Sequence, residues 1–93
     1  PYLRHLSNES LRNLFDEVTV IFLLSHLKNS PVEIDRQNSV ENTRKFSHIQ
    51  IEMHSRSLPI TTFAYSKARI LDAAKRQNLP SEVTEWLDTI LGA

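Results

Sequence analysis

Hydrophobic positions in the first third of the chain recur every three or four residues, which is the spacing of one face of an α-helix. The positions that carry this pattern are Leu11, Leu14, Phe15, Val18, Ile21 and Phe22. Ser7 or Asn8 supplies an N-cap, and the polar segment 29–31, which ends in a proline, marks a stop. The sequence therefore predicts one helix over about residues 8–28.

The second half of this predicted helix is apolar nearly all round. Within residues 18–24 the only polar side chain is Thr19. So short a run cannot span a bilayer, which takes about 20 apolar residues, and no membrane span is expected. A helix without a polar face is surrounded by its own domain or by a partner, and we expect Phe22 to be among its most sensitive core positions.

Residues 46–54 fit two kinds of secondary structure. Ile49, Ile51 and Met53 alternate with polar residues as in a half-buried strand, whereas Phe46, Ile49 and Met53 also share one face of a helix. The chain has no glycine here for a tight hairpin turn, which favours the helix. The alternative is an α+β fold with a small sheet formed by residues 32–35 and 48–54.

Polar residues and prolines divide the rest of the chain. Residues 31–38 are predicted to form a connection that Val32 and Ile34 attach to the core. A threonine at 61–62 then caps a third helix that reaches about Gln77. The apolar side of this helix is predicted to carry Phe63, Ala64, Ala68, Ile70, Leu71 and Ala74.

The last predicted helix has the most regular pattern in the chain. Asn78 suits a left-handed helix end, and Pro80 can open the helix that follows. An i, i+3, i+4, i+7, i+8 series of apolar residues comprises Val83, Trp86, Leu87, Ile90 and Leu91, and the opposite face carries Glu82, Glu85 and Asp88. We expect Trp86 to pack against the first helix of the same chain with its indole N–H directed at a carbonyl.

These elements predict an all-α fold, a compact bundle of about four helices in a single domain over residues 1–93. Apolar residues make up 40% of the chain and charged residues 24%, which is ordinary for a folded domain and too apolar for a disordered one. Position 1 is Pro rather than Met, so we expect either a processed chain or a piece of a longer protein.

Two counts exclude whole classes of function. The chain has no cysteine, which excludes disulfides, thiolate zinc sites and cysteine nucleophiles and accords with a cytoplasmic location. Its only glycine is Gly92, so phosphate-binding loops, dinucleotide folds and nucleophile elbows lack the residue that they need. We therefore expect no cofactor.

The nearest approach to a chemical motif is the set His48, Glu52 and His54. Its spacing matches no zinc motif, and histidines on a polar face are usually solvated. The other histidines, His5 and His26, have no neighbouring serine or carboxylate in a nucleophile context. We expect no metal site, no catalytic residue and no enzymatic activity.

Charge is distributed unevenly along the chain. Residues 1–35 hold three Lys/Arg against five Asp/Glu, residues 36–76 hold eight against three, and residues 77–93 hold none against three. The basic middle can meet the acidic end within the domain or across a dimer. It can also bind phosphates, so the alternative function is a small nucleic-acid-binding regulator that uses segment 36–76, with contacts from Arg44, Lys45, Lys67, Arg69, Lys75 and Arg76.

The function that the sequence favours is non-catalytic binding of another protein or of a second copy, in a regulatory or adaptor role. No chemical motif is present, and so short a chain has more apolar helix surface than it easily buries. The residues predicted to bind the partner are Phe22, Leu23, Trp86, Leu87 and Ile90.

Overall fold

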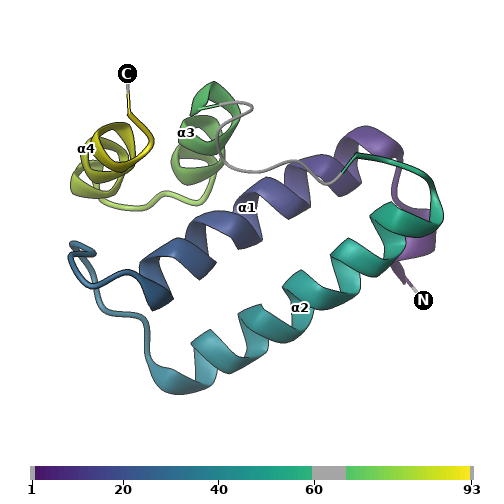
Figure 1. The fold of residues 1–93 in the computed structure, drawn as a ribbon, viewed down its shortest axis with the longest axis horizontal. Helices are drawn as coiled ribbons and strands as arrows, with labels where there is room; N and C mark the ends of the chain where they lie inside the picture. Colours follow the sequence, from purple (N-terminus) through teal and green to yellow (C-terminus); the bar gives the residue numbers. More distant parts are fainter. Residues whose placement is uncertain (1, 60–66, 93) are drawn as a thin grey trace.

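A computed structural model describes residues 2–59 and 67–92, and every regular element within these ranges is a helix. In chain order they are a short 3₁₀-helix η1 (Tyr2–His5), α1 (Asn8–His26), α2 (Arg36–Ser55), α3 (Lys67–Arg76) and α4 (Ser81–Ile90), as Figure 1 shows. The predicted all-α bundle of four helices is confirmed. The alternative α+β fold is wrong, because residues 48–54 are helical and 32–35 are irregular.

Helix α1 lies in the middle of the molecule, with α2 along one side and the α3–α4 pair against the other (Figure 1). The second half of α1 is apolar nearly all round, so it is stable only where other helices cover it. Its central position in the bundle provides this cover. None of the described helices is both long enough and apolar enough to cross a membrane.

The apolar side chains form two clusters, and α1 contributes to both. The first cluster joins the C-terminal half of α1 to α3 and α4, and its buried members are Val20, Leu23, Leu24, Ile70, Ala73, Ala74, Val83 and Leu87. The second joins the N-terminal half of α1 to α2, and its buried members are Leu11, Phe15, Val18, Ile49 and Met53. Val32 and Ile34 pack against the first cluster, as predicted for the connection.

Helix α1 begins and ends close to the predicted bounds. The side-chain oxygen of Ser7 accepts a hydrogen bond from the backbone N–H of Ser10 at 3.1 Å, which satisfies one of the unpaired amides of the first turn. At the other end, Leu27 leaves the helical conformation while its N–H still bonds the carbonyl of Leu23.

Helix α2 starts earlier than predicted, and residues 36–38 belong to the helix rather than to a connection. The cause is Asp35, an N-cap whose carboxylate accepts a hydrogen bond from the backbone N–H of Asn38 at 2.9 Å. Asn42 is buried against α1 and donates to the carbonyl oxygen of Val18 at 3.0 Å. Ile51 is 67% exposed, which excludes the strand-like alternation.

The α3–α4 pair is joined by a tight turn. Asn78 has φ 56°, the left-handed conformation predicted for it, and Pro80 is the N-cap of α4 rather than its first helical residue. Ala68 was predicted on the apolar side of α3, but it is exposed at the beginning of that helix. The predicted cap at 61–62 and the predicted apolar positions 63 and 64 lie outside the described residues.

Candidate functional site

The five residues predicted to bind a partner lie in different environments. Leu23 is 5% exposed and Leu87 is fully buried, both inside the first cluster, so their side chains are covered by this chain itself. Trp86 is half-buried against the same cluster, and Ile90 is 40% exposed at the end of α4. The five residues therefore do not form one exposed patch.

Phe22 is a half-buried member of a row of rings between α1 and α2. Its ring lies 5.1 Å from the ring of Phe46 and 4.2 Å from that of His26, centroid to centroid. Phe46 in turn lies 5.3 Å from Phe15. Offset contacts of this kind stabilise a pair of helices beyond simple area burial, so Phe22 already has partners within the chain.

Trp86 packs against the cluster shared by α1, α3 and α4, which agrees with an intrachain position. Its indole Nε1 is buried and has no hydrogen-bond partner among the described residues. The expected hydrogen bond from the indole N–H to a carbonyl is therefore wrong.

Three of the six basic candidates are held in ion pairs by acidic residues of the same chain. On α3, Arg69 Nε lies 2.8 Å from the carboxylate of Asp16, and Arg76 Nε lies 3.1 Å from that of Glu17. Lys67 Nζ lies 2.6 Å from a carboxylate oxygen of Asp88 on α4. These contacts hold α3 against α1 and α4 and reduce the charge available to phosphates.

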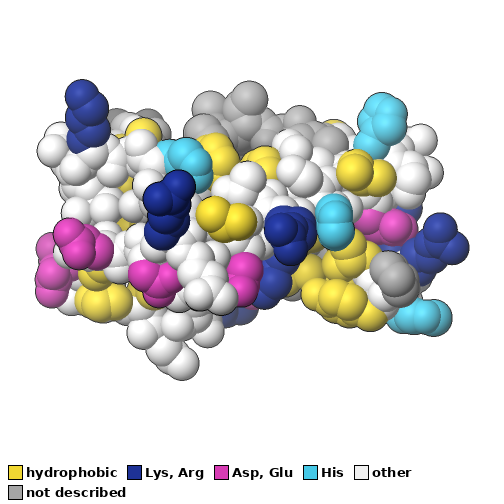
Figure 2. All heavy atoms as spheres, turned by 90° about the horizontal axis from the view of Figure 1, so that it is seen from below, with side chains coloured by type: hydrophobic (Ala, Val, Ile, Leu, Met, Phe, Trp, Pro, Cys, Tyr) yellow, Lys and Arg dark blue, Asp and Glu magenta, His cyan; other side chains and the backbone are white. Residues whose placement is uncertain are grey.

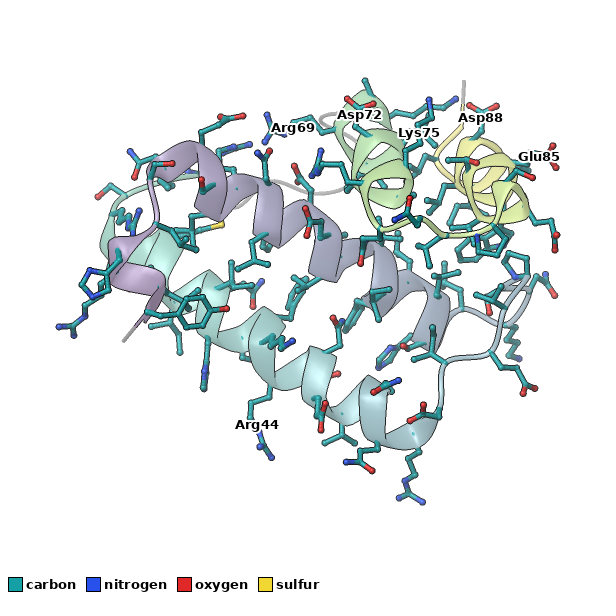
Figure 3. All side chains as sticks on the ribbon, turned by 180° about the vertical axis from the view of Figure 1, so that it is seen from behind. Arg44, Arg69, Asp72, Lys75, Glu85 and Asp88 are labelled. Atoms are coloured by element: carbon teal, nitrogen blue, oxygen red, sulfur yellow. The ribbon has the colours of Figure 1, made fainter. Side chains whose placement is uncertain are left out.

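The remaining basic candidates do not extend α3 into a larger basic surface. Arg44 and Lys45 are exposed on α2, whereas Lys75 is exposed on α3. Figure 3 shows Arg44 on one side of the molecule and Lys75 on the other, with Asp72 beside Lys75. Arg44 on α2 and Lys75 on α3, which belong to one basic segment of the sequence, thus lie on opposite sides of the bundle.

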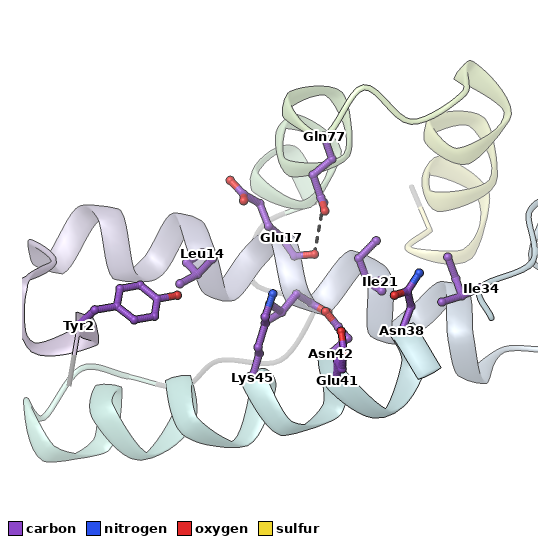
Figure 4. Close-up of a pocket in the computed structure, with 11 residues that line it drawn as sticks. Tyr2, Leu14, Glu17, Ile21, Ile34, Asn38, Glu41, Asn42, Lys45 and Gln77 are labelled. Carbon is purple, nitrogen blue, oxygen red and sulfur yellow. Dashed lines mark hydrogen bonds between the residues drawn. The ribbon is translucent and has the colours of Figure 1, made fainter. Parts of the chain in front are cut away.

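A groove follows the part of α1 that neither α2 nor α3 covers, and Figure 4 shows its lining. Its volume is about 330 Å³. Its apolar residues are Leu14, Val18 and Ile21 on α1 and Ile34 in the connection. Its polar residues are Tyr2, Glu17, Asn38, Glu41, Asn42, Lys45 and Gln77.

Hydrogen bonds fix the two edges of this groove. Gln77 Nε2, at the end of α3, donates to the backbone carbonyl of Glu17 at 3.2 Å (Figure 4). On the other edge, the buried side chain of Asn42 ties α2 to the carbonyl of Val18. At one end, a smaller hollow of about 60 Å³ continues between Tyr2 and His48.

Sequence reasoning missed this groove. The floor of the groove is formed by α1, whose second half is apolar nearly all round. The hydrophobic pattern alone does not show which side of α1 is left uncovered by the other helices. The one available signal was the pair Val32 and Ile34, because apolar residues in a polar connection indicate a segment that closes over the end of a helix pair.

The side chains of His48, Glu52 and His54 do not form a metal-binding site. His48 and His54 are exposed, and the Glu52 carboxylate lies 2.9 Å from Arg56 Nε. Within residues 2–59 and 67–92, no three His, Asp or Glu side chains gather closely enough to hold a metal ion. Comparison with protein-family models, curated proteins and solved structures finds no significant match to this chain.

Proposed function

We propose that this chain is a non-catalytic protein-interaction domain with a regulatory or adaptor role. In this proposal, an amphipathic helix of another protein lies in the groove along α1. The observation that carries the proposal is the apolar floor of that groove, formed by Leu14, Val18 and Ile21 between polar edges. An apolar floor with a polar rim is the anatomy of a site that recognises a protein surface.

The dimensions of the groove favour a helix over a small molecule. Leu14 and Ile21 are seven residues apart on α1, which corresponds to about 10 Å at the rise of an α-helix. A partner helix offers anchors at i, i+3 or i+4, and i+7 over the same distance. The volume of about 330 Å³ is at the lower end of the roughly 300–1,000 Å³ of small-molecule sites, and the groove opens to solvent.

The charged residues on the α2 edge of the groove determine which charges on a partner helix are complementary. Glu41 and Lys45 line the groove one helical turn apart, and neither makes an ion pair with a described residue. A partner helix that places a basic residue opposite Glu41 and an acidic residue opposite Lys45 complements both. A cytoplasmic location is part of the proposal, since a chain without cysteine needs no oxidising compartment.

The test uses a designed helical peptide with leucines at i, i+3, i+4 and i+7, flanked by one lysine and one glutamate. Titrated into ¹⁵N-labelled protein, it is expected to shift the amide signals of the groove residues. A peptide of the same composition, with the leucines spread around the helix, is the control. Shifts elsewhere in the molecule, or none at millimolar peptide, would contradict the proposal.

A charge exchange then tests the orientation of the peptide. The double variant Glu41→Lys with Lys45→Glu changes two exposed side chains without altering net charge. It is expected to weaken binding of the designed peptide about tenfold, and a peptide with its lysine and glutamate exchanged is expected to recover the loss. Equal binding of both peptides by both proteins would exclude the proposed contacts.

A further inference from the structure

The outer face of α2 points away from the other described helices and carries two arginines. The residues along it are spaced by three and four, and all are exposed: Arg36, Val40, Arg44, Ser47 and Ile51. Val40 is 52% exposed and Ile51 67% exposed, which is high for large apolar side chains. Figure 2 views the molecule from this side and shows separate hydrophobic side chains with Lys, Arg and His side chains between them, together with acidic side chains that gather mostly toward one end.

The two acidic residues of α2 lie off this face. Glu41 lines the groove, and Glu52 is paired with Arg56. Neither Arg36 nor Arg44 makes an ion pair with a described residue. Both arginines therefore remain without an ion-pair partner within the part of the chain that the structure describes.

The outer face of α4 has the opposite character. Glu82, Glu85 and Asp88 are three residues apart and exposed. Asp88 pairs with Lys67, whereas Glu82 and Glu85 make no ion pair with a described residue. Figure 3 shows Glu85 and Asp88 on the side of the molecule opposite Arg44.

We infer that this chain associates with a second copy of itself, the acidic outer face of α4 in one copy docking on the basic outer face of α2 in the next. The two faces are complementary in charge, and the α2 face adds the exposed side chains of Val40 and Ile51. The faces lie on opposite sides of one molecule (Figure 3), so a contact between them joins two copies. The contact joins two different surfaces, so it is heterologous, and each added copy leaves one free face at either end.

This inference rests on residues outside the groove and does not depend on the proposed helix binding. Because the contacts are exposed ion pairs, association is expected to be weak and to fall steeply with salt. Sedimentation of the wild-type chain at low ionic strength is expected to show a mass that rises with concentration. In about 0.5 M salt, where the Debye length is only a few Å, the mass should return to that of one chain.

Two charge-reversal variants make the test specific. One carries Arg36→Glu and Arg44→Glu on α2, and the other carries Glu82→Lys and Glu85→Lys on α4. Each alone is expected to associate at least about tenfold more weakly than wild type. Mixed in equal amounts they should associate again, because the unchanged acidic α4 face of the first meets the unchanged basic α2 face of the second, and the two reversed faces are complementary as well. Circular dichroism checks that both variants fold.

The variant Arg4→Glu with Lys28→Glu is the matched control. It makes the same change in net charge at exposed positions outside α2 and α4, and it is expected to associate better than the α2 variant. A wild-type chain that stays monomeric at low ionic strength overturns the inference. So does association that survives either face variant, or a mixture of the two variants that stays monomeric while the wild type associates.

Discussion

Asp16 is the one charged side chain that is buried among the residues the structure describes, with 2% of its surface exposed. Its carboxylate accepts a hydrogen bond from Arg69 Nε at 2.8 Å, and Arg69 also donates to the side chain of Asn13 at 3.1 Å. A carboxylate in this position is tolerated because its charge is paired and hydrogen-bonded. The pair therefore fixes where α3 sits on α1.

Replacing Asp16 by Asn is expected to lower the free energy of unfolding by about 1–3 kcal/mol, because Arg69 loses its charged acceptor. The value stays below that of a fully buried pair because the Arg69 side chain is 29% exposed. Urea denaturation measures it. Asp72→Asn, which removes an exposed carboxylate from α3, serves as the control and should change stability by less than about 0.5 kcal/mol. Equal losses in the two variants would contradict the assigned role.

Single residues also show where sequence reasoning stops. Leu11 belongs to the predicted helical spacing and is fully buried. Phe22 has the same spacing and is only half-buried, with its ring stacked on those of Phe46 and His26. The spacing of hydrophobic residues shows which face of a helix is buried. How completely each residue on that face is buried depends on neighbours that are distant in the chain.

At the scale of whole elements, the strength of the hydrophobic pattern decided what could be predicted. Helix α1 was predicted closely, because its apolar spacing is unbroken and its cap is clear. The beginning of α2 was missed, because its first turns carry no apolar residue that faces inward and Asn42 occupies the position against α1. The groove was missed, because its position and width depend on how far apart α2 and α3 lie, which no spacing along one helix shows.

Two serines at the C-terminus of α2 allow the effect of backbone conformation on stability to be predicted and tested. Ser57 has φ 58°, a left-handed conformation that is strained for a residue with a Cβ, whereas Ser55 is the last helical residue. Ser57→Gly is expected to raise stability by about 0.5–1 kcal/mol, and Ser55→Gly to lower it by about 0.5 kcal/mol. Thermal unfolding measures both. Shifts of the same sign in the two variants would exclude the explanation by backbone conformation.

At the scale of the molecule, α1 belongs to both hydrophobic clusters, so the two sides of the bundle are expected to unfold together. Trp86, the only tryptophan, reports on the first cluster, and Met53 lies 1% exposed in the second. Both clusters can therefore be followed in one experiment.

Met53→Ala is expected to cost about 2–5 kcal/mol through loss of packing. It should shift the midpoint of the Trp86 fluorescence transition as far as that of circular dichroism, although Met53 lies in the other cluster. Ile51→Ala, at a side chain that is 67% exposed, is the control and should shift neither midpoint appreciably. A fluorescence midpoint that stays fixed while circular dichroism moves would show that the clusters unfold independently.

The central position of α1 also has a consequence for the order of folding. Helices α1 and α2 follow one another along the chain, as do α3 and α4, so each pair forms after closing only a short loop. The contact between Asp16 and Arg69 joins residues 53 positions apart, which makes the docking of α3 on α1 the slow, late event. In stopped-flow measurements, Asp16→Asn should therefore speed unfolding and leave refolding within about twofold of wild type.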